Sequence, residues 1–404
     1  MRLLFVASRP PYPPIQGDRL RAYYFLQHLA RRHSITLVAP VFDPLTPETQ
    51  QANAALAQTW IPVPIPRRWW AWAALRYPFG RKPLQTLLFT APGLTRVVRE
   101  LVGRQTFDLA HVQLARLGPV AQALPPSLPR VLDFIDALSL NMARRATREP
   151  WPKRAFFHLE AQRMARYERI LTRTYTQQVI TSATDRAAIG DFPTLHVVPN
   201  GVDVEAYAFY DGPREPGLIV FEGRMGYFPN EEAAVYFATS VFPRVRQIFP
   251  QARFVIVGAN PTPRVRRLAQ RPGIEVTGFV PRVQDYLRRA QVAVAPMRTG
   301  TGIQNKVLQA MAVGAPVVAT PQALGGITAQ PGKHLLVAES PTEMAAQVAR
   351  LLRDAPLGRR LARAARAWVV AHHSWAQATA QLESVYARAL EGHSPVGGPL
   401  TRPA

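Results

Sequence analysis

The sequence predicts an α/β protein with two doubly wound, Rossmann-like domains that face a central cleft. The chain has 404 residues, more than one hydrophobic core usually organises. Short apolar runs of strand length alternate with longer segments of helical periodicity, which is typical of a parallel sheet covered on both faces. The alternation stops at a turn signal near Asn200 and restarts after a Pro- and Gly-rich stretch at residues 212–217. We therefore expect one domain on each side of this break.

Residues 1–200 are expected to form the first domain. Its strands are predicted over 3–7, 35–39, 109–112, 131–135, 179–182 and 196–198. A helix follows Gly17 and a longer one covers about 152–174, each with apolar residues at helical spacing.

Residues 201–374 are expected to form the second domain. Its strands are predicted over 218–221, 254–257, 274–277, 292–295 and 316–319, and its helices over 231–247, 283–289, 303–313, 341–353 and 357–372. A last helix at 375–391 is expected to join the first domain, followed by a flexible tail at 392–404. Ligands of doubly wound sheets bind at the carboxyl ends of the strands, so the chemistry is expected in the cleft between the sheets.

Composition restricts the class of protein. The chain has no cysteine, which excludes disulfides, zinc–thiolate sites and cysteine nucleophiles, and no HExxH spacing suggests another metal site. Neither a membrane-spanning apolar run nor a signal peptide is visible, so the chain is expected to stay in the cytosol. The net charge of +23 indicates an anionic partner (nucleic acid, anionic lipid or a phosphorylated substrate) unless it reflects coding bias alone. Scattered basic residues without a recognition module disfavour nucleic acid.

Residues 67–77 combine three Trp with flanking Arg. Amphipathic rings beside cations are typical of a helix at a membrane interface. The alternative is a helix packed against its own sheet, since Trp is also common in cores.

The segment 295–306 carries the strongest chemical pattern, because glycines join a buried strand to a helix. Gly300 and Gly302 allow the backbone to approach a ligand, and the free amides of 302–304 would face it. The helix dipole adds positive charge, so a diphosphate is the natural occupant. Arg298 and Lys306 flank the loop and would neutralise a departing phosphate. The pattern is neither a Walker loop nor a dinucleotide GxGxxG.

Two other strand ends of the second domain carry candidates. Gly223 and Arg224 follow the strand at 218–221, where Arg224 either forks onto a phosphate or is simply solvated. Gly278, Phe279 and Val280 end a further strand and offer backbone groups to a nucleobase edge.

The first domain offers candidates in its first loop and at its strand ends. Gly17 and Asp18 head the first long helix, where Asp18 is best interpreted as its N-cap. Asp133 and Asp136 lie at the end of a buried strand, and a carboxylate there is a candidate base or hydroxyl anchor. His111 is either a core histidine or a catalytic one. No Ser-His-Asp order or GxSxG elbow supports a hydrolase.

Residues 302–319, GIQNKVLQAMAVGAPVVA, resemble the donor-binding segment of family 4 retaining glycosyltransferases, glycosyl transferases group 1, which have the GT-B fold. The resemblance is closest to the sugar transferases of bacterial exopolysaccharide and exosortase systems. It extends over nearly the whole chain, through 17–21, 160–169, 198–203, 223–225 with Pro229 and Asn230, 277–280, and Trp375.

This resemblance implies a nucleoside-diphosphate sugar held by the second domain, an acceptor held by the first, and no cofactor or obligatory metal. Retention is usually written as a same-face attack in which the donor diphosphate helps to deprotonate the acceptor. The implied donor contacts are Gly223 and Arg224 for phosphate, Gly278, Phe279 and Val280 for the base, and Gly302, Ile303 and Gln304 for diphosphate and sugar.

The sequence departs from the family pattern at three places. The usual Glu-x7-Glu pair falls on Thr301 and Gln309, of which Gln309 keeps only a neutral hydrogen-bonding group for the donor ribose. The familiar lysine five residues after Arg224 is Pro229, which leaves Arg298 or Lys306 to supply that charge. The usual histidine of the first domain is replaced by Ile135 or Asp136, and we favour Asp136 as the sugar or acceptor anchor.

The sequence thus predicts a glycosyltransferase that extends a polyprenyl-linked or polysaccharide acceptor in cell-surface glycan synthesis. Asp136, Arg224 and Lys306 are its expected catalytic residues. The basic surface and the Trp segment would hold it peripherally on the inner face of the cytoplasmic membrane. The alternative is a non-catalytic GT-B scaffold, motivated by Thr301 and Gln309. Nucleic-acid binding rests on charge alone and is not expected.

Overall fold

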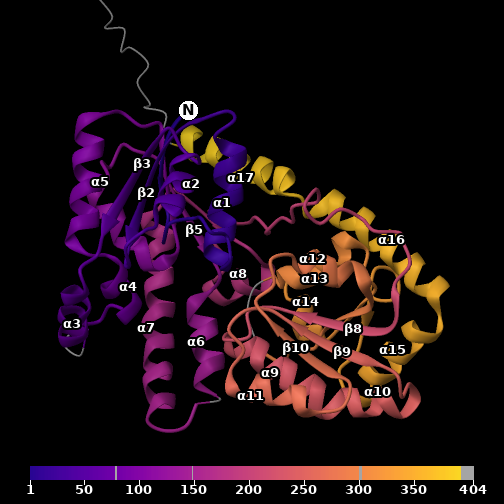
Figure 1. The fold of residues 1–404 in the computed structure, drawn as a ribbon. Helices are drawn as coiled ribbons and strands as arrows, with labels where there is room; N and C mark the ends of the chain where they lie inside the picture. The colour runs from indigo at the N-terminus through magenta and orange to yellow at the C-terminus, as the bar shows by residue number, and fades with distance from the viewer. Residues whose placement is uncertain (78–79, 148, 300–302, 393–404) are drawn as a thin grey trace, which may run out of the picture. The chain divides into compact units, whose positions relative to one another are not determined.

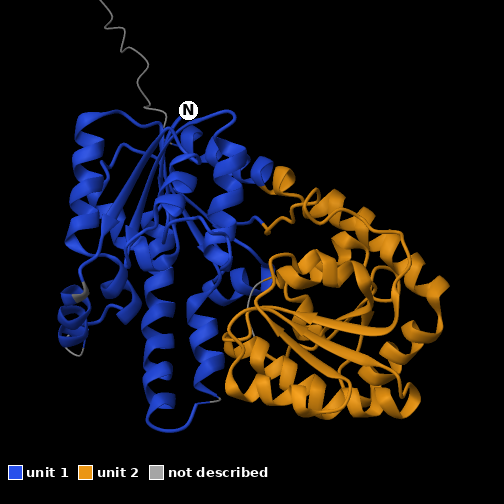
Figure 2. Ribbon diagram, in the orientation of Figure 1, with its two compact units in different colours: residues 1–198, 379–404 blue, residues 199–378 orange. Residues whose placement is uncertain are grey.

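The structure is a computed structural model that describes residues 1–77, 80–147, 149–299 and 303–392, apart from the side chain of Arg67 (Figure 1). The chain divides into two compact units, Pro199–Ala378 and Met1–Val198 with Thr379–Ala404 (Figure 2). The predicted tail at 392–404 lies, except for Gly392, outside the described residues.

The described strands of the first unit form one parallel sheet with the order β3-β2-β1-β4-β5-β6-β7. They are β1 (Arg2–Val6), β2 (Ser34–Val41), β3 (Thr59–Pro64), β4 (Leu109–Gln113), β5 (Arg130–Ile135), β6 (Gln177–Ile180) and β7 (Leu195–Val197). Buried strands of a parallel sheet are apolar throughout, which is why their runs stand out in the sequence. The sequence did not predict β3, an edge strand whose two prolines weaken the pattern.

The helices of the first unit connect these strands along the chain (Figure 1). They are α1 (Gly17–Leu29), α2 (Pro47–Ala54), α3 (Arg67–Arg76), α4 (Leu84–Phe89), α5 (Pro92–Arg104), the 3-10 helix η2 (Ala115–Ala123), α6 (Leu138–Ala146), α7 (Lys153–Thr174) and α8 (Ala183–Ile189). The last helix, α17 (Trp375–Glu391), belongs to this unit from Thr379 onward.

The described strands of the second unit form a parallel sheet with the order β10-β9-β8-β11-β12-β13. They are β8 (Glu215–Glu222), β9 (Arg253–Val257), β10 (Ile274–Gly278), β11 (Ala290–Ala295), β12 (Val317–Ala319) and β13 (Leu336–Val337). The predicted class, an α/β protein with two doubly wound sheets, is therefore confirmed.

The helices of the second unit differ from the prediction mainly at their starts. They are α9 (Phe228–Tyr236), the π-helix η3 (Phe237–Val241), α10 (Phe242–Ile248), α11 (Pro263–Arg266), the 3-10 helix η4 (Arg267–Gln270), α12 (Val283–Arg289), α13 (Asn305–Val313), α14 (Pro321–Leu324), α15 (Pro341–Arg353) and α16 (Ala355–His372). The helix expected over 231–247 begins earlier, at Phe228, because Pro229 fits the first turn of a helix.

Gly314 ends α13 in the left-handed conformation, with a φ of 84°. A Cβ atom at this position would lie 2.4 Å from the ring of Phe209. Both backbone and packing therefore require glycine where the chain leaves α13 and turns toward β12.

Candidate functional site

The carboxyl edge of the second sheet brings together loops that are far apart in the sequence. Gly223 follows β8, Gly258 follows β9 and Gly278 ends β10, and β9 lies parallel between the other two strands. A Cβ atom on Gly258 would lie 1.9 Å from the carbonyl oxygen of Gly223. Glycine at Gly258 therefore lets the loop after β8 lie directly against the end of β9.

Lys306 is tied to the loop that follows β8. Its Nζ donates to Asn230 Oδ1 at 2.7 Å, and Asn230 Nδ2 donates to the carbonyl oxygen of Arg224 at 3.0 Å. The same ammonium lies 5.5 Å from the ring centre of Phe221. Burial lowers the pKa of Lys306 to about 8, although the carboxyl of Glu222 acts against this shift. Two candidates, Lys306 and Arg224, thus share one hydrogen-bonded network.

Glu222 is a buried carboxyl beside this network. Its Oε1 is buried and has no hydrogen-bond partner among the described residues. Burial raises its pKa, and the ammonium of Lys306 lowers it. A carboxyl and an ammonium that are both poorly solvated form a site whose charge depends on pH and on any bound ion.

The helix that was predicted to start at Ile303 begins later. Gln304 is its extended N-cap residue, and α13 starts at Asn305. Ile303 is buried in the hydrophobic core rather than aligned with the helix. The predicted helix start at Ile303 is therefore wrong, while the expectation that the amides of 302–304 face a ligand stays a prediction.

The remaining donor-side candidates surround this helix start. Arg298 is exposed and lies 5.1 Å from the ring centre of Tyr236, while Thr299 Oγ1 donates to Glu232 at 2.7 Å. Gln309 is half-buried, one turn after Lys306 on the same face of α13. Gly300, Thr301 and Gly302 lie outside the described residues.

The residues predicted to contact a nucleobase end β10 at the same sheet edge. Gly278 has a φ of 71°, and its carbonyl oxygen accepts from the amide of Gly258 at 3.1 Å. Phe279 is 73% exposed, and Val280 is half-buried. An exposed aromatic ring at a strand end can stack on a flat ligand.

Asp136 lies at the carboxyl edge of the first sheet, directly after a strained residue. Ile135 has a φ of 62°, which is rare for a β-branched side chain. Asp133 Oδ1 accepts from the Ile135 amide at 3.0 Å, and Thr181 Oγ1 donates to the Ile135 carbonyl at 2.8 Å. Burial and the nearby carboxylate of Asp185 raise the pKa of Asp136 to about 7. Asp136 therefore changes charge in the neutral range.

The prediction that Asp18 is the N-cap of α1 is wrong, because Gln16 holds that position. Gly17 is exposed in the first turn, and the Asp18 carboxylate instead accepts from Ser8 Oγ at 2.9 Å and pairs with Arg9 at 3.3 Å. The carboxylate thus fastens α1 to the loop after β1.

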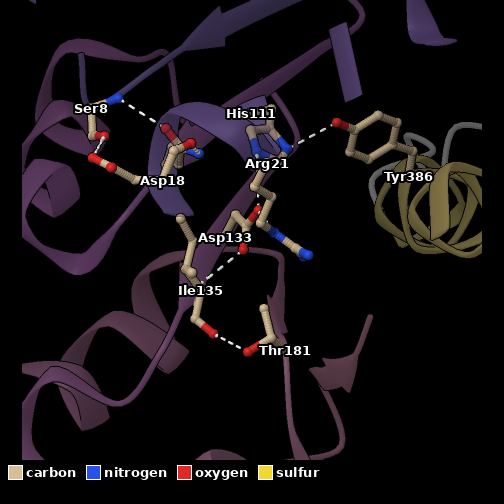
Figure 3. A network of polar contacts seen from close by, with 9 residues as sticks. Ser8, Asp18, Arg21, His111, Asp133, Ile135, Thr181 and Tyr386 are labelled. Atoms are coloured by element: carbon tan, nitrogen blue, oxygen red, sulfur yellow. Dashed lines mark hydrogen bonds and ion pairs between the residues drawn. The ribbon is translucent and has the colours of Figure 1, made fainter. Parts of the chain in front are cut away.

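Asp133 and His111 belong to a buried network rather than to an open site (Figure 3). Asp133 accepts from Arg21 Nε at 2.6 Å, and both side chains are fully buried. His111 stacks on Phe5 and shares a hydrogen bond of 2.8 Å with Tyr386 of α17. Burial lowers the pKa of His111 to about 4, so the ring is neutral. These contacts favour the interpretation of His111 as a core histidine.

Comparisons with known proteins agree with this geometry. Residues 216–354, most of the second unit, match the family model described as glycosyl transferases group 1. Solved structures are similar over nearly the entire chain, although a search of curated proteins found no match. The chain is a glycosyltransferase that carries a group 1 domain.

Three of these solved structures show the extent of the likeness. Sucrose-phosphate synthase from Thermosynechococcus elongatus has a TM-score of 0.72 and 15% identity, and the match covers 97% of this chain and 100% of that chain. Anabaena HepE in complex with UDP has a TM-score of 0.69 and 15% identity, and the match covers 96% of this chain and 100% of that chain. A mutant of TarM from S. aureus has a TM-score of 0.67 and 9% identity, and the match covers 96% of this chain and 99% of that chain. At these identities the likeness shows the fold, which is GT-B.

The glycosyltransferase also contains polar residues that sequence reasoning missed. The sequence did not predict a role for Asn230, Glu222, Arg9 or Arg116. Their partners lie far along the chain (76 residues separate Lys306 from Asn230), so no local pattern indicates them.

Two features are absent from the described residues. No three His, Asp or Glu side chains gather in a way that would hold a metal ion. In the same part of the chain, no helix is long and apolar enough to cross a membrane.

Proposed function

We propose that this glycosyltransferase transfers a sugar with retention from a nucleoside-diphosphate sugar to a lipid-linked or polysaccharide acceptor. The observation that carries the proposal is the network joining Lys306, Asn230 and Arg224 at the carboxyl edge of the second sheet. It joins the ammonium of Lys306 to the backbone of Arg224 beside one strand end, and phosphates bind at such ends in doubly wound folds. HepE, a similar structure, has been solved with UDP and with UDP-glucose.

In this proposal the bond between the anomeric carbon and the diphosphate oxygen breaks while a bond to the acceptor hydroxyl forms on the same face. The hydroxyl proton passes to the departing diphosphate. Lys306 and Arg224 stabilise the negative charge that develops on the leaving group. Asp136 accepts a hydrogen bond from a sugar hydroxyl and orients it. None of these roles uses a metal ion or a cofactor.

A screen of nucleotide sugars by thermal shift, followed by product analysis with a polyprenyl-linked acceptor, tests the proposal. We expect one nucleotide sugar to raise the melting temperature and to yield a product with the donor's anomeric configuration. Stabilisation without transfer or donor hydrolysis would instead support the non-catalytic scaffold, for which the neutral Gln309 is the motivating observation. Absence of any stabilisation would reject both.

We further propose that the enzyme acts peripherally on the inner face of the cytoplasmic membrane. On α3, Trp70 is 47%, Trp72 is 39% and Leu75 is 72% exposed. Ala73 is the one buried residue among those of α3 whose side chains are described. A helix that exposes two indoles beside Arg68 and Arg76 suits an anionic membrane surface.

A further inference from the structure

Two arginines of the first unit contact the same aromatic ring. The guanidinium of Arg116 lies 4.5 Å from the ring centre of Phe89, and that of Arg9 lies 5.8 Å from it. Arg9 follows β1 and Arg116 follows β4, which are parallel neighbours in the sheet. Both side chains therefore stand at the carboxyl edge of the first sheet, where Asp136 follows the next strand, β5.

The two guanidinium groups differ in their oxygen partners. Arg9 Nη1 donates to Gln16 Oε1 at 2.5 Å, and its Nε lies 3.3 Å from Asp18 Oδ2. No ion pair joins Arg116 to a carboxylate in the part of the chain that the structure describes, and its buried Nε has no hydrogen-bond partner there. The carboxylates of Asp18 and Asp136 act on Arg116 through charge alone. Burial lowers the pKa of Arg116 to about 10.

A buried guanidinium nitrogen without an acceptor, as at Arg116 Nε, is unfavourable, because a neighbouring ring replaces only part of its hydration. The usual explanation for such an orphaned donor is an anion or water that occupies the site in the working protein. Two guanidinium groups that converge on one ring are suited to phosphate oxygens, which arginine binds with two donors at once.

The other side of this site is apolar and leads to α3. Phe89 packs against Phe42 at 5.0 Å between ring centres, and Phe42 packs against Trp70 at 5.8 Å. Trp70 is 47% exposed. The rings of Phe89, Phe42 and Trp70 form a chain of contacts, which we call the aromatic path, from the arginine pair to the exposed face of α3.

We propose that Arg9 and Arg116 bind the phosphate of a lipid phosphate or diphosphate acceptor, whose hydrocarbon chain lies along the aromatic path. This inference rests on the proposed function only in taking the first unit as the acceptor unit. Among the proposed acceptors it selects the lipid-linked class, since a neutral polysaccharide would bring no anion to Arg116.

Titration calorimetry on the full-length protein tests the proposal, with farnesyl diphosphate and inorganic pyrophosphate as the two probes. Saturating UDP is present to occupy the proposed donor site. We expect Arg116→Met to weaken farnesyl diphosphate binding at least tenfold and Arg116→Lys to weaken it less. Arg96→Met is the matched control, because Arg96 is an exposed arginine on α5 of the same unit. Its affinity should equal that of the wild type.

The two probes separate a lipid site from a bare phosphate site. Tighter binding of farnesyl diphosphate than of pyrophosphate, lost in Phe42→Ala, supports the aromatic path. Equal affinities for both probes would overturn the lipid part of the proposal. Equal affinities of Arg116→Met and wild type, with unchanged melting temperatures, would overturn the phosphate site.

The proposed function is judged separately, by UDP binding alone. Failure of UDP to bind would contradict the donor site of the second unit. An effect of Arg116→Met on farnesyl diphosphate would still stand in that case, because Arg116 lies in the first unit.

Discussion

The residues that turn the chain at the carboxyl edge of the first sheet are strained. Leu114 and Ile135 have φ values of 69° and 62°, and such conformations cost about 1–3 kcal/mol each. Each lies at the end of a strand, shortly before Arg116 and Asp136 respectively. Strain of this kind persists where the surroundings impose it, and it gathers at functional sites. The two turns therefore support a functional role for Arg116 and Asp136.

At this scale Asp136 gives a prediction about pH. Its pKa of about 7, raised by burial, means that the carboxyl is neutral below that pH and ionised above it. If the carboxylate anchors a sugar hydroxyl, kcat/KM should rise between about pH 6 and 8. We expect Asp136→Asn to lower kcat/KM by about 10- to 100-fold, the worth of a hydrogen bond to a charged group. A pH–rate profile of both proteins checks this.

Glu168 provides the control for this assignment. Its pKa is also about 7, raised by burial, but its carboxyl is hydrogen-bonded to Ser139 inside the first unit. Glu168→Gln should keep the rise in activity that Asp136→Asn removes. If Asp136→Asn retains the rise and Glu168→Gln loses it, the anchor role belongs elsewhere.

Lys306 gives a second prediction about pH, with the opposite sign. Its pKa of about 8, lowered by burial, means that the ammonium is charged below that pH and neutral above it. The affinity for UDP should therefore fall as the pH rises from 7 to 9. We expect Lys306→Gln to weaken UDP binding at pH 7 by about tenfold or more and to flatten this dependence. Calorimetric titrations from pH 7 to 9 measure this dependence. If the affinity of Lys306→Gln for UDP falls with pH as steeply as that of the wild type, Lys306 is not the source of the pH dependence.

At the scale of elements, the end of α13 determines how the helix that carries Lys306 and Gln309 is held. Gly314 adopts the left-handed conformation and touches the ring of Phe209. Arg214 Nη2 also donates to the carbonyl oxygen of Gly314 at 2.6 Å. The C-terminal end of the helix is thus fixed by backbone, packing and a charged hydrogen bond together.

We therefore expect Gly314→Ala to lower the free energy of unfolding by about 1–3 kcal/mol, because alanine is disfavoured at positive φ and its Cβ would press on Phe209. Denaturant unfolding measures this change. Gly103→Ala is the control, since Gly103 lies near the end of α5 with nothing within 4 Å of an added Cβ. That substitution should stabilise the protein slightly, by up to about 1 kcal/mol. A similar loss of unfolding free energy in both variants would mean that the left-handed conformation of Gly314 does not cause the destabilisation.

At the scale of the whole molecule, the sequence predicted the parts that depend on local patterns. Buried parallel strands such as β9 appear as apolar runs, and carboxyl strand ends indicate where candidates such as Gly223 gather. The predicted start of α13 was wrong, because Ile303 fits the helical period but packs in the core ahead of the helix, which begins at Asn305. The role of Asp18 was wrong because its partners, Ser8 and Arg9, come from another loop. Contacts across tens of residues leave no periodic signal, which is why the arginine pair was missed.

The net charge of +23 and the exposed indoles of α3 together predict how the whole molecule meets a membrane. Vesicles that contain anionic lipid should retain the protein at low salt, and about 0.5 M NaCl should release most of it, because salt screens charges over less than 10 Å. Replacing both Trp70 and Trp72 by alanine should reduce retention at low salt, since interfacial indoles contribute apolar burial as well. Vesicle sedimentation measures both effects. Ile248→Ala, which removes an exposed apolar side chain from α10 of the second unit, should sediment like the wild type. Equal retention of the double variant would show that charge alone binds the membrane and that α3 is not the contact.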